Sequence, residues 1–168
     1  VLIRVRELFP NILWQPLLAA FYLGFVIYLF SLFVGNKVTW AVGVGALASS
    51  ACVVFGSPSK KAAQIKNLIG GYIIALFFGL TLHLLSLYLS PQAVLKYCYI
   101  NEAWITIVVG LTMATMAVFN LYHPPAVGLS IVVVIDTCSY TSAWIILASV
   151  FLLILLCKLL RSYLIDIF

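Results

Sequence analysis

Residues 103–135 read AWITIVVGLTMATMAVFNLYHPPAVGLSIVVVI, a stretch of 33 residues without one charged side chain. The stretch is too long for one membrane-spanning helix, which needs about 20 residues, and too short for two full spans with a turn. The tripeptide His123-Pro124-Pro125 interrupts it. Proline removes a helical hydrogen bond and clashes with the preceding turn, and the residue before it leaves the α region. We therefore predict one helix over 103–121 and a short, proline-started helix over 124–137.

The short helix is the unusual element. At about 1.5 Å per residue, the 13 residues from Pro124 to Asp136 extend about 20 Å, whereas the hydrocarbon core of a bilayer is roughly 30 Å thick. Two alternatives follow: either the break at Pro124 lies inside the membrane, or the helix continues past Asp136.

The composition of the whole chain indicates a membrane protein. Of its 168 residues, 65% are hydrophobic and 8% are charged, whereas soluble domains carry about 25% charged residues. The mean hydropathy of +1.23 makes the lipid bilayer the expected partner. The net charge of +5 comes without a basic surface run, which argues against nucleic acid. Other charge-free stretches predict helices over 14–34, 38–55, 67–90 and 141–162, after an interfacial segment over 1–13.

These elements predict an all-α fold, a polytopic membrane helix bundle that forms a single domain over 1–168. The bundle has about five full spans and one short helix, which makes six helical elements. The segments from Gly45 to Pro58 and from Gly110 to Pro124 both read as a small-residue helix, a turn and a proline-started helix. They suggest a weak internal repeat, a feature that many transporters carry.

The distribution of positive charge predicts the topology. If the short helix crosses the membrane, both termini lie on one side with seven of the nine Lys and Arg residues, and Lys37 and Lys96 lie on the other. If it re-enters instead, the split becomes five to four. Because positive charge accumulates in cytoplasmic loops, we predict six crossings with both termini cytoplasmic. The majority group is Arg4, Arg6, Lys60, Lys61, Lys66, Lys158 and Arg161.

The start of the short helix is the first candidate binding site. Proline suits the first helical position, and the amides from Ala126 onward would then point out of the helix end as free donors. Such an end carries partial positive charge and binds anions. Asn120, Tyr122 and His123 are further donors beside it. The alternative is a sharp turn at the membrane surface with His123 as a cap.

Two other polar features are candidates. Ser57 precedes Pro58, Lys60 and Lys61, so a capped helix start with positive potential is expected there, although an ordinary positive loop would look the same. His83 lies in the middle of a predicted helix, on a polar stripe that has to face the bundle interior. It is either a structural histidine or a proton-relay or substrate group.

Three predicted helices have faces of small residues, which in membranes mark close helix packing or a solute path. They comprise Ala41, Gly45, Ser49 and Cys52; Gly71, Ala75 and Gly79; and Thr106, Gly110, Ala114 and Ala117.

The chain resembles the HPP family of integral membrane proteins, which takes its name from a His-Pro-Pro motif. The matching stretches are GALASSACVVFGSPSKKAAQIKNLIGGY at 45–72 and VGLTMATMAVFNLYHPPA at 109–126. Here Lys66, Tyr72 and Val127 replace the residues that the family often has, and these departures bear on the substrate more than on the fold. Members are usually described as four-helix proteins. Plant and cyanobacterial members are linked to nitrite transport, so the resemblance implies nitrite or a similar small monoanion as substrate. It also implies a bacterial or cyanobacterial inner membrane or a chloroplast envelope as the location.

The sequence and the resemblance together predict a transporter or channel for a small anion, nitrite, held at the broken helix. The alternative is a non-transporting scaffold or a subunit of a larger complex. No enzyme activity, cofactor or metal is expected, because the four acidic residues are dispersed and the two histidines have no nearby carboxylate. A homo-oligomer is compatible with the sequence. The predicted binding residues are Asn120, His123, Pro124, Pro125, Ala126, Ser57, Asn67 and His83.

Overall fold

The computed structural model describes residues 2–34, 37–89, 102–135 and 141–167, and within these ranges every regular element is helical. The predicted all-α fold is therefore confirmed, with six α-helices in the described part of the chain. A short 3₁₀ helix, η1 (Lys61–Ala63), lies between the second and third of them. The α-helices are α1 (Leu2–Phe33), α2 (Lys37–Gly56), α3 (Ile65–Leu89), α5 (Glu102–Val118), α6 (Pro125–Ile135) and α7 (Thr141–Leu160).

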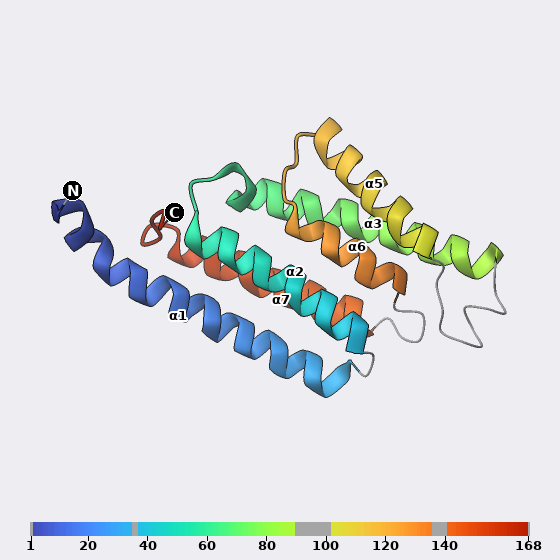
Figure 1. Cartoon of the computed structure of the whole chain (residues 1–168), viewed down its shortest axis with the longest axis horizontal. Coiled ribbons are helices and arrows are strands. Elements are labelled where there is room, and N and C mark those ends of the chain that lie inside the picture. Colours follow the sequence, from blue (N-terminus) through green and yellow to red (C-terminus); the bar gives the residue numbers. More distant parts are fainter. Residues whose placement is uncertain (1, 35–36, 90–101, 136–140, 168) are drawn as a thin grey trace.

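The six helices lie side by side along one axis, and successive helices run in opposite directions (Figure 1). The two ends of the chain, the α2–α3 loop and the α5–α6 junction therefore lie toward the same end of the bundle. That end carries Lys60 and Lys61 in the loop, Lys66 at the start of α3, and Lys158 and Arg161 at the end of α7. This is the grouping of positive charge that the sequence predicts.

Four helices are long and apolar enough to cross a membrane, judged by length and composition within the described residues. They are Leu13–Phe33 within α1, α2, α3 and Ala143–Leu160 within α7. The other two are shorter, with 17 residues in α5 and 11 in α6. At about 1.5 Å per residue α6 extends only about 16 Å, roughly half the hydrocarbon core.

Among the described residues, the helix boundaries differ from the predicted ones by more than two residues at two places. Helix α1 begins at Leu2, so the segment predicted as a separate interfacial stretch over 1–13 is continuous with the first span. Helix α5 ends at Val118 instead of 121, before the prolines are reached. The predicted end of the short helix at 137 lies outside the described residues.

Asn120 explains the early end of α5. Its φ of 56° is left-handed, a conformation that asparagine adopts more readily than most residues. The amide of Leu121 donates to the carbonyl of Met116 (2.9 Å), and the amide of Asn120 donates to that of Ala117 (3.2 Å). This pair of bonds is the Schellman arrangement that closes a helix C-terminus. Asparagine, not proline, therefore stops α5, and the prolines only start α6.

Helix α6 is the central element of the bundle and packs against α2, α3, α5 and α7. Three glycines let it approach its neighbours. A Cβ built on Gly71 would lie 2.9 Å from Cβ of His123, and one on Gly79 would lie 2.8 Å from Cβ of Val133. One on Gly128 of α6 would lie 2.8 Å from Cβ of Ala46. The small-residue face of α3 is thus a packing surface, as small residues in membrane helices allow.

The small-residue faces of α2 and α5 behave differently. Gly45 and Gly110 have no atom within 4 Å of a built Cβ, and both are exposed. These two faces therefore do not pack against another helix of the described chain, and they point outward.

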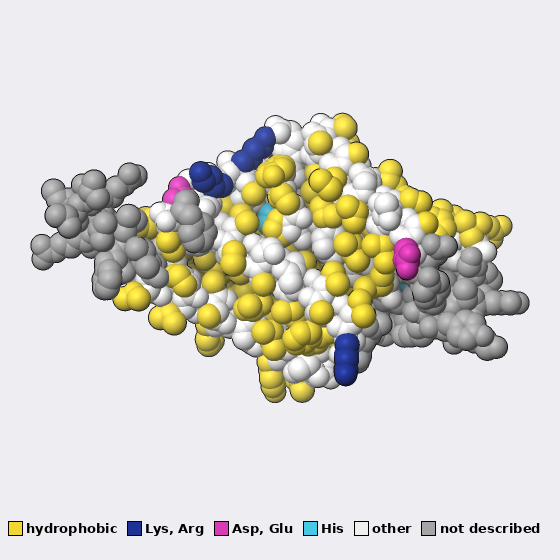
Figure 2. Space-filling model, viewed as in Figure 1, with side chains coloured by type: hydrophobic (Ala, Val, Ile, Leu, Met, Phe, Trp, Pro, Cys, Tyr) yellow, Lys and Arg dark blue, Asp and Glu magenta, His cyan; other side chains and the backbone are white. Residues whose placement is uncertain are grey.

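The surface of the described residues suits a lipid environment. On the face that Figure 2 shows, hydrophobic side chains are spread over the middle, and the few charged side chains lie at the margins of the described part. Large apolar side chains such as Phe21, Phe77 and Phe151 are more than 60% exposed, which in water would strongly favour aggregation.

Candidate functional site

His123 is fully buried at the junction between α5 and α6. The Schellman turn at Asn120 ends α5, and residues 121–123 form a short nonhelical link before α6 begins at Pro125. Leu121 in this link packs against α3, where a Cβ on Gly70 would lie 2.7 Å from its side chain. The link therefore points the imidazole of His123 inward, between α2 and α3.

Three groups hydrogen-bond in a chain that includes His123. Its Nδ1 lies 2.8 Å from the carbonyl oxygen of Ala62, and its Nε2 lies 3.0 Å from Oγ of Ser50. Oγ of Ser50 lies 2.7 Å from the hydroxyl of Tyr72. The rings of Tyr72 and His123 also contact each other, with centroids 5.4 Å apart. We name Ser50, Tyr72 and His123 the His123 cluster.

The direction of these bonds follows from their partners. A carbonyl only accepts, so Nδ1 of His123 carries the proton and donates to Ala62. Nε2 of the neutral ring then accepts from the hydroxyl of Ser50, whose one proton it shares with the carbonyl of Ala46 (3.1 Å), and Ser50 accepts from Tyr72. The side-chain donors of the cluster are thus all engaged. His123 makes one hydrogen bond to a residue outside the cluster, to the carbonyl of Ala62.

The cluster lies well inside the helix ends. Ser50 stands six residues before the end of α2 at Gly56, and Tyr72 stands seven residues after the start of α3 at Ile65. At about 1.5 Å per residue, both positions are about 9–10 Å inward. Figure 1 likewise shows the start of α6 inward of the α2–α3 loop.

The amides at the start of α6 are not free donors. The amide of Ala126 donates to the carbonyl of His123, and the amide of Val127 donates to that of Pro124, both at 3.0 Å. The prediction of free amides from Ala126 onward is therefore wrong for the first two, because a tight turn at the prolines satisfies them. The amides of Ala126 and Val127 therefore cannot serve as donors for an anion, and the imidazole of His123 is the nearest buried side-chain donor.

The predicted site residues Asn120 and Asn67 lie beside the cluster and hold the loop above it. Oδ1 of Asn120 accepts a hydrogen bond from the ammonium of Lys61, and Nδ2 of Asn67 donates to the carbonyl of Lys61 (2.5 Å). Asn67 is buried, whereas Asn120 is exposed. Both residues therefore bind the same residue of the α2–α3 loop.

Ser57 and His83 occupy other places. No α-helix begins at Pro58, so the predicted capping role of Ser57 is wrong; its carbonyl accepts from the amide of Lys60 in a turn (3.1 Å), and α3 begins only at Ile65. His83 is buried, and its Nδ1 lies 3.4 Å from the carbonyl of Val134. It stands 11 residues beyond Tyr72 on α3, about 16 Å along the helix, and so lies apart from the cluster.

Sequence reasoning did not identify Ser50, Tyr72 and Ala62 as partners of His123. Ser50 stands next to a small-residue face, and Tyr72 follows the pair Gly70 and Gly71. The sequence contains a polar position on each helix, but the pairing depends on how α6 lies against α2 and α3. The Ala62 contact is made by the backbone and has no side-chain signal at all.

A hollow opens beside the cluster on the surface of the bundle. Its volume is about 460 Å³, and it lies between the outer face of α2 and the Pro124 turn. The residues that line it are Ser49, Val53, Ala62, Tyr122, Pro124 and Pro125. Ala62 thus borders both the hollow and the buried imidazole. Pro124 and Pro125, both predicted site residues, form one wall.

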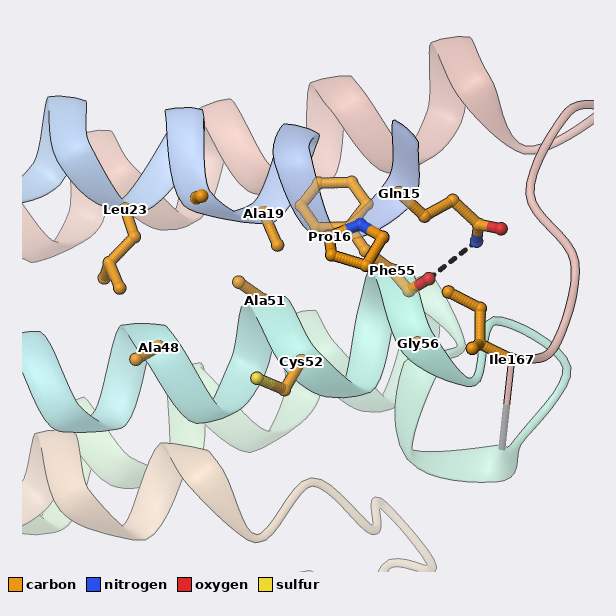
Figure 3. A pocket seen from close by; sticks show the side chains of 11 residues that line it. Gln15, Pro16, Ala19, Leu23, Ala48, Ala51, Cys52, Phe55, Gly56 and Ile167 are labelled. Carbon is orange, nitrogen blue, oxygen red and sulfur yellow. Dashed lines mark hydrogen bonds between the residues drawn. The ribbon is translucent and has the colours of Figure 1, made fainter. Parts of the chain in front are cut away.

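A second hollow between α1 and α2 has a volume of about 320 Å³ and a largely apolar lining (Figure 3). Gln15 at one end donates from Nε2 to the carbonyls of Phe55 (2.6 Å) and Ile165 (3.0 Å). This hollow offers no free donor to an anion. Among the described residues, no group of three or more His, Cys, Asp or Glu side chains is placed to hold a metal ion.

The sequence model of a family described as "HPP, transmembrane region" matches residues 6–166 of the chain. The chain belongs to the HPP family. No curated protein and no solved structure gives a significant match. With the four apolar spans, membership in a transmembrane family makes this HPP protein an integral membrane protein. The tripeptide that names the family holds the buried imidazole at the α5–α6 junction.

Tyr72→Phe tests the hydrogen-bond chain of this HPP protein. The variant removes the hydroxyl that Ser50 accepts from, and we expect the free energy of unfolding to fall by about 1–2 kcal/mol, the usual effect of losing a buried hydrogen bond. Thermal unfolding in detergent measures it. Tyr28→Phe, at an exposed position of α1, is the matched control and should change nothing. Equal stability of both variants would contradict the bond.

Proposed function

We propose that this HPP protein is a transporter or channel for a small monoanion, and that nitrite is its substrate. The observation that carries the proposal is a buried imidazole donor at a broken helix, backed by two hydroxyl groups and covered by a lysine-bearing loop. The resemblance to plant and cyanobacterial HPP proteins linked to nitrite transport supports the choice of substrate. We further propose that the loop side faces the cytoplasm, because positive charge gathers there.

The cluster suits an anion that has to be released again. Nδ1–H of His123 is a neutral donor, and neutral donors bind an anion more weakly than a buried lysine or arginine would. A transport site has to bind its ion firmly enough to admit it and weakly enough to let it go. Nitrite is small and bent, and each of its oxygens accepts hydrogen bonds, so one of them can take the place of a carbonyl oxygen.

The lysines contribute at long range. Lys60 and Lys61 are exposed on the loop, and Lys66 is exposed at the start of α3. Exposed like charges at one opening raise the local concentration of anions, an effect that falls as the ionic strength rises. They stay in water, which avoids the cost of burying a charge in the membrane.

Nitrite uptake into proteoliposomes tests the proposal directly. We expect purified protein to carry nitrite faster than empty vesicles, and the excess flux to fall as salt is raised, because the lysines are screened. A flux equal to that of empty vesicles would refute transport and favour the scaffold alternative. Vesicles that contain the Ser149→Ala variant, in which only a local bond to Ile145 within α7 is lost, are the matched control and should carry nitrite normally.

A further inference from the structure

Residues 57–64 join α2 to α3 and lie across the His123 cluster; we name them the strap. The half of the strap that contains Lys61 and Ala62 is hydrogen-bonded to His123 and to two asparagines beside it. Ala62 accepts from Nδ1 of His123, Lys61 donates to Asn120, and the Lys61 carbonyl accepts from Asn67. This half closes the cluster off from the hollow at Pro124, because Ala62 borders both.

The other half of the strap is bound to the end of the described chain. The carboxylate of Asp166 accepts from the amide of Ser59 (3.0 Å) and from its hydroxyl. The amide of Ile167 donates to the carbonyl of Gly56 at the end of α2 (2.8 Å). Gln15 links the same region to α1, since its Nε2 donates to the carbonyl of Phe55 (Figure 3) and to that of Ile165. Residues 164–167 thus hold the strap where it leaves α2.

Asp166 is charged when it makes these bonds. The hydroxyl and the amide of Ser59 hold the pKa of its carboxyl below the ordinary value, and the charge of nearby Lys60 adds to this effect. Arg161 lines the same small hollow as Ser59 and Asp166. At neutral pH the carboxylate is therefore an acceptor with two donors from one residue of the strap.

The strap itself has little apolar anchoring. Only Ala63 is buried within it, while Ser59, Lys60, Lys61 and Gln64 are exposed. Its one regular element is the three-residue 3₁₀ helix η1. Water competes for exposed polar bonds, so each contributes little net free energy, and segments held in this way open locally at low cost. The position of the strap therefore depends on a few polar bonds, those of Lys61 and Ala62 in one half and that of Ser59 in the other.

We propose that the strap is a gate over His123 and that Asp166 is its latch. The inference rests on the proposed function and concerns the control of the same site. While the gate is closed, the Ala62 carbonyl occupies the acceptor position on Nδ1 of His123. When Asp166 releases Ser59, the strap lifts, the carbonyl leaves, and Nδ1–H becomes a free donor facing the hollow. An anion oxygen then replaces the carbonyl oxygen, so the substrate and the strap compete for the hydrogen bond that Nδ1–H of His123 donates.

Chemical modification of histidine tests the gate without any substrate. The chain has two histidines, His83 and His123, and diethyl pyrocarbonate acylates accessible neutral imidazole nitrogens. In proteoliposomes that contain Asp166→Asn, we expect His123 to react about two to five times faster than in the wild type, the change expected from losing a charge-assisted bond that water screens. His83, buried far from the strap, should react at its wild-type rate. Peptide mass spectrometry separates the two sites.

Two further variants sharpen the test. Ser59→Ala removes one of the two donors to Asp166 and should give a smaller rise at His123. Glu102→Gln, the matched control, removes an exposed carboxylate at the opposite end of the bundle and should leave both rates unchanged. An unchanged His123 rate in Asp166→Asn overturns the latch. An equal rise at both histidines also overturns it, because that pattern means general loosening.

The labelling result and the flux result are independent. If vesicles with the wild-type protein carry no nitrite but His123 is modified faster in Asp166→Asn, the gate is supported and the proposed substrate is refuted. If wild-type vesicles carry nitrite and the His123 rate does not rise, the function stands and the gate falls.

Discussion

His123→Ala should lower nitrite flux by at least about tenfold and the free energy of unfolding by about 3 kcal/mol. The substitution removes the donor to Ala62 and the acceptor of Ser50, and it leaves a space where a fully buried ring now lies. A lost interaction of about 1.4 kcal/mol with the bound anion already corresponds to a factor of ten. Proteoliposome uptake and thermal unfolding in detergent measure the two effects separately.

His123→Asn separates binding from folding. Its side-chain amide keeps a donor near the position of Nδ1 and can still reach Ala62, but it cannot accept from Ser50 in the same way. We expect partial flux and a smaller loss of stability than in His123→Ala. Wild-type flux in a folded His123→Ala protein would contradict the role of this residue in transport.

Gly79→Val should destabilise the protein by about 2–3 kcal/mol and lower its melting temperature by roughly 4–10 °C. Even a single Cβ at Gly79 would lie 2.8 Å from Cβ of Val133 and 3.2 Å from the backbone oxygen of Ser130. Neither atom is the tip of a flexible side chain, so α6 as a whole has to move away from α3. Thermal unfolding in detergent shows the change.

Gly24→Val is the matched control for this prediction. Gly24 lies on α1, and a Cβ there meets no atom within 4 Å. Because valine has a slightly better helix propensity than glycine, this variant should be as stable as the wild type or a few tenths of a kcal/mol more stable. If the two variants have the same melting temperature, the close contact of α3 with α6 does not exist.

Much of the fold could be predicted from the chain because the governing signals are local. The prolines mark where α6 starts, charge-free stretches mark the spans, and the lysines cluster at the end where the chain reverses. The sequence predicts the end of α5 three residues too late, because the prolines are the stronger signal for a helix end. A left-handed Asn120 stops the helix earlier, and asparagine also occurs within helices, so its type alone does not predict that role.

The candidate site was only partly predictable. His123 was identified, but its partners lie 73 residues away at Ser50 and 61 residues away at Ala62. Such pairings depend on the packing of α6 and on the path of the strap, which no short pattern in the sequence specifies. The small-residue stripes show the same limit, because the stripe of α3 packs on α6, whereas those of α2 and α5 face outward.

The three glycine contacts of α6 have a mechanical consequence. Gly79 of α3 lies close against Val133 of this helix, Gly71 lies close against His123 just before it, and Gly128 lies close against Ala46 of α2. A helix packed in this way stays in place, since sliding by even a fraction of a turn would drive side chains into backbone. If the proposed gate operates, the moving part is therefore the strap, and its opening rate depends on a few polar bonds that exchange with water.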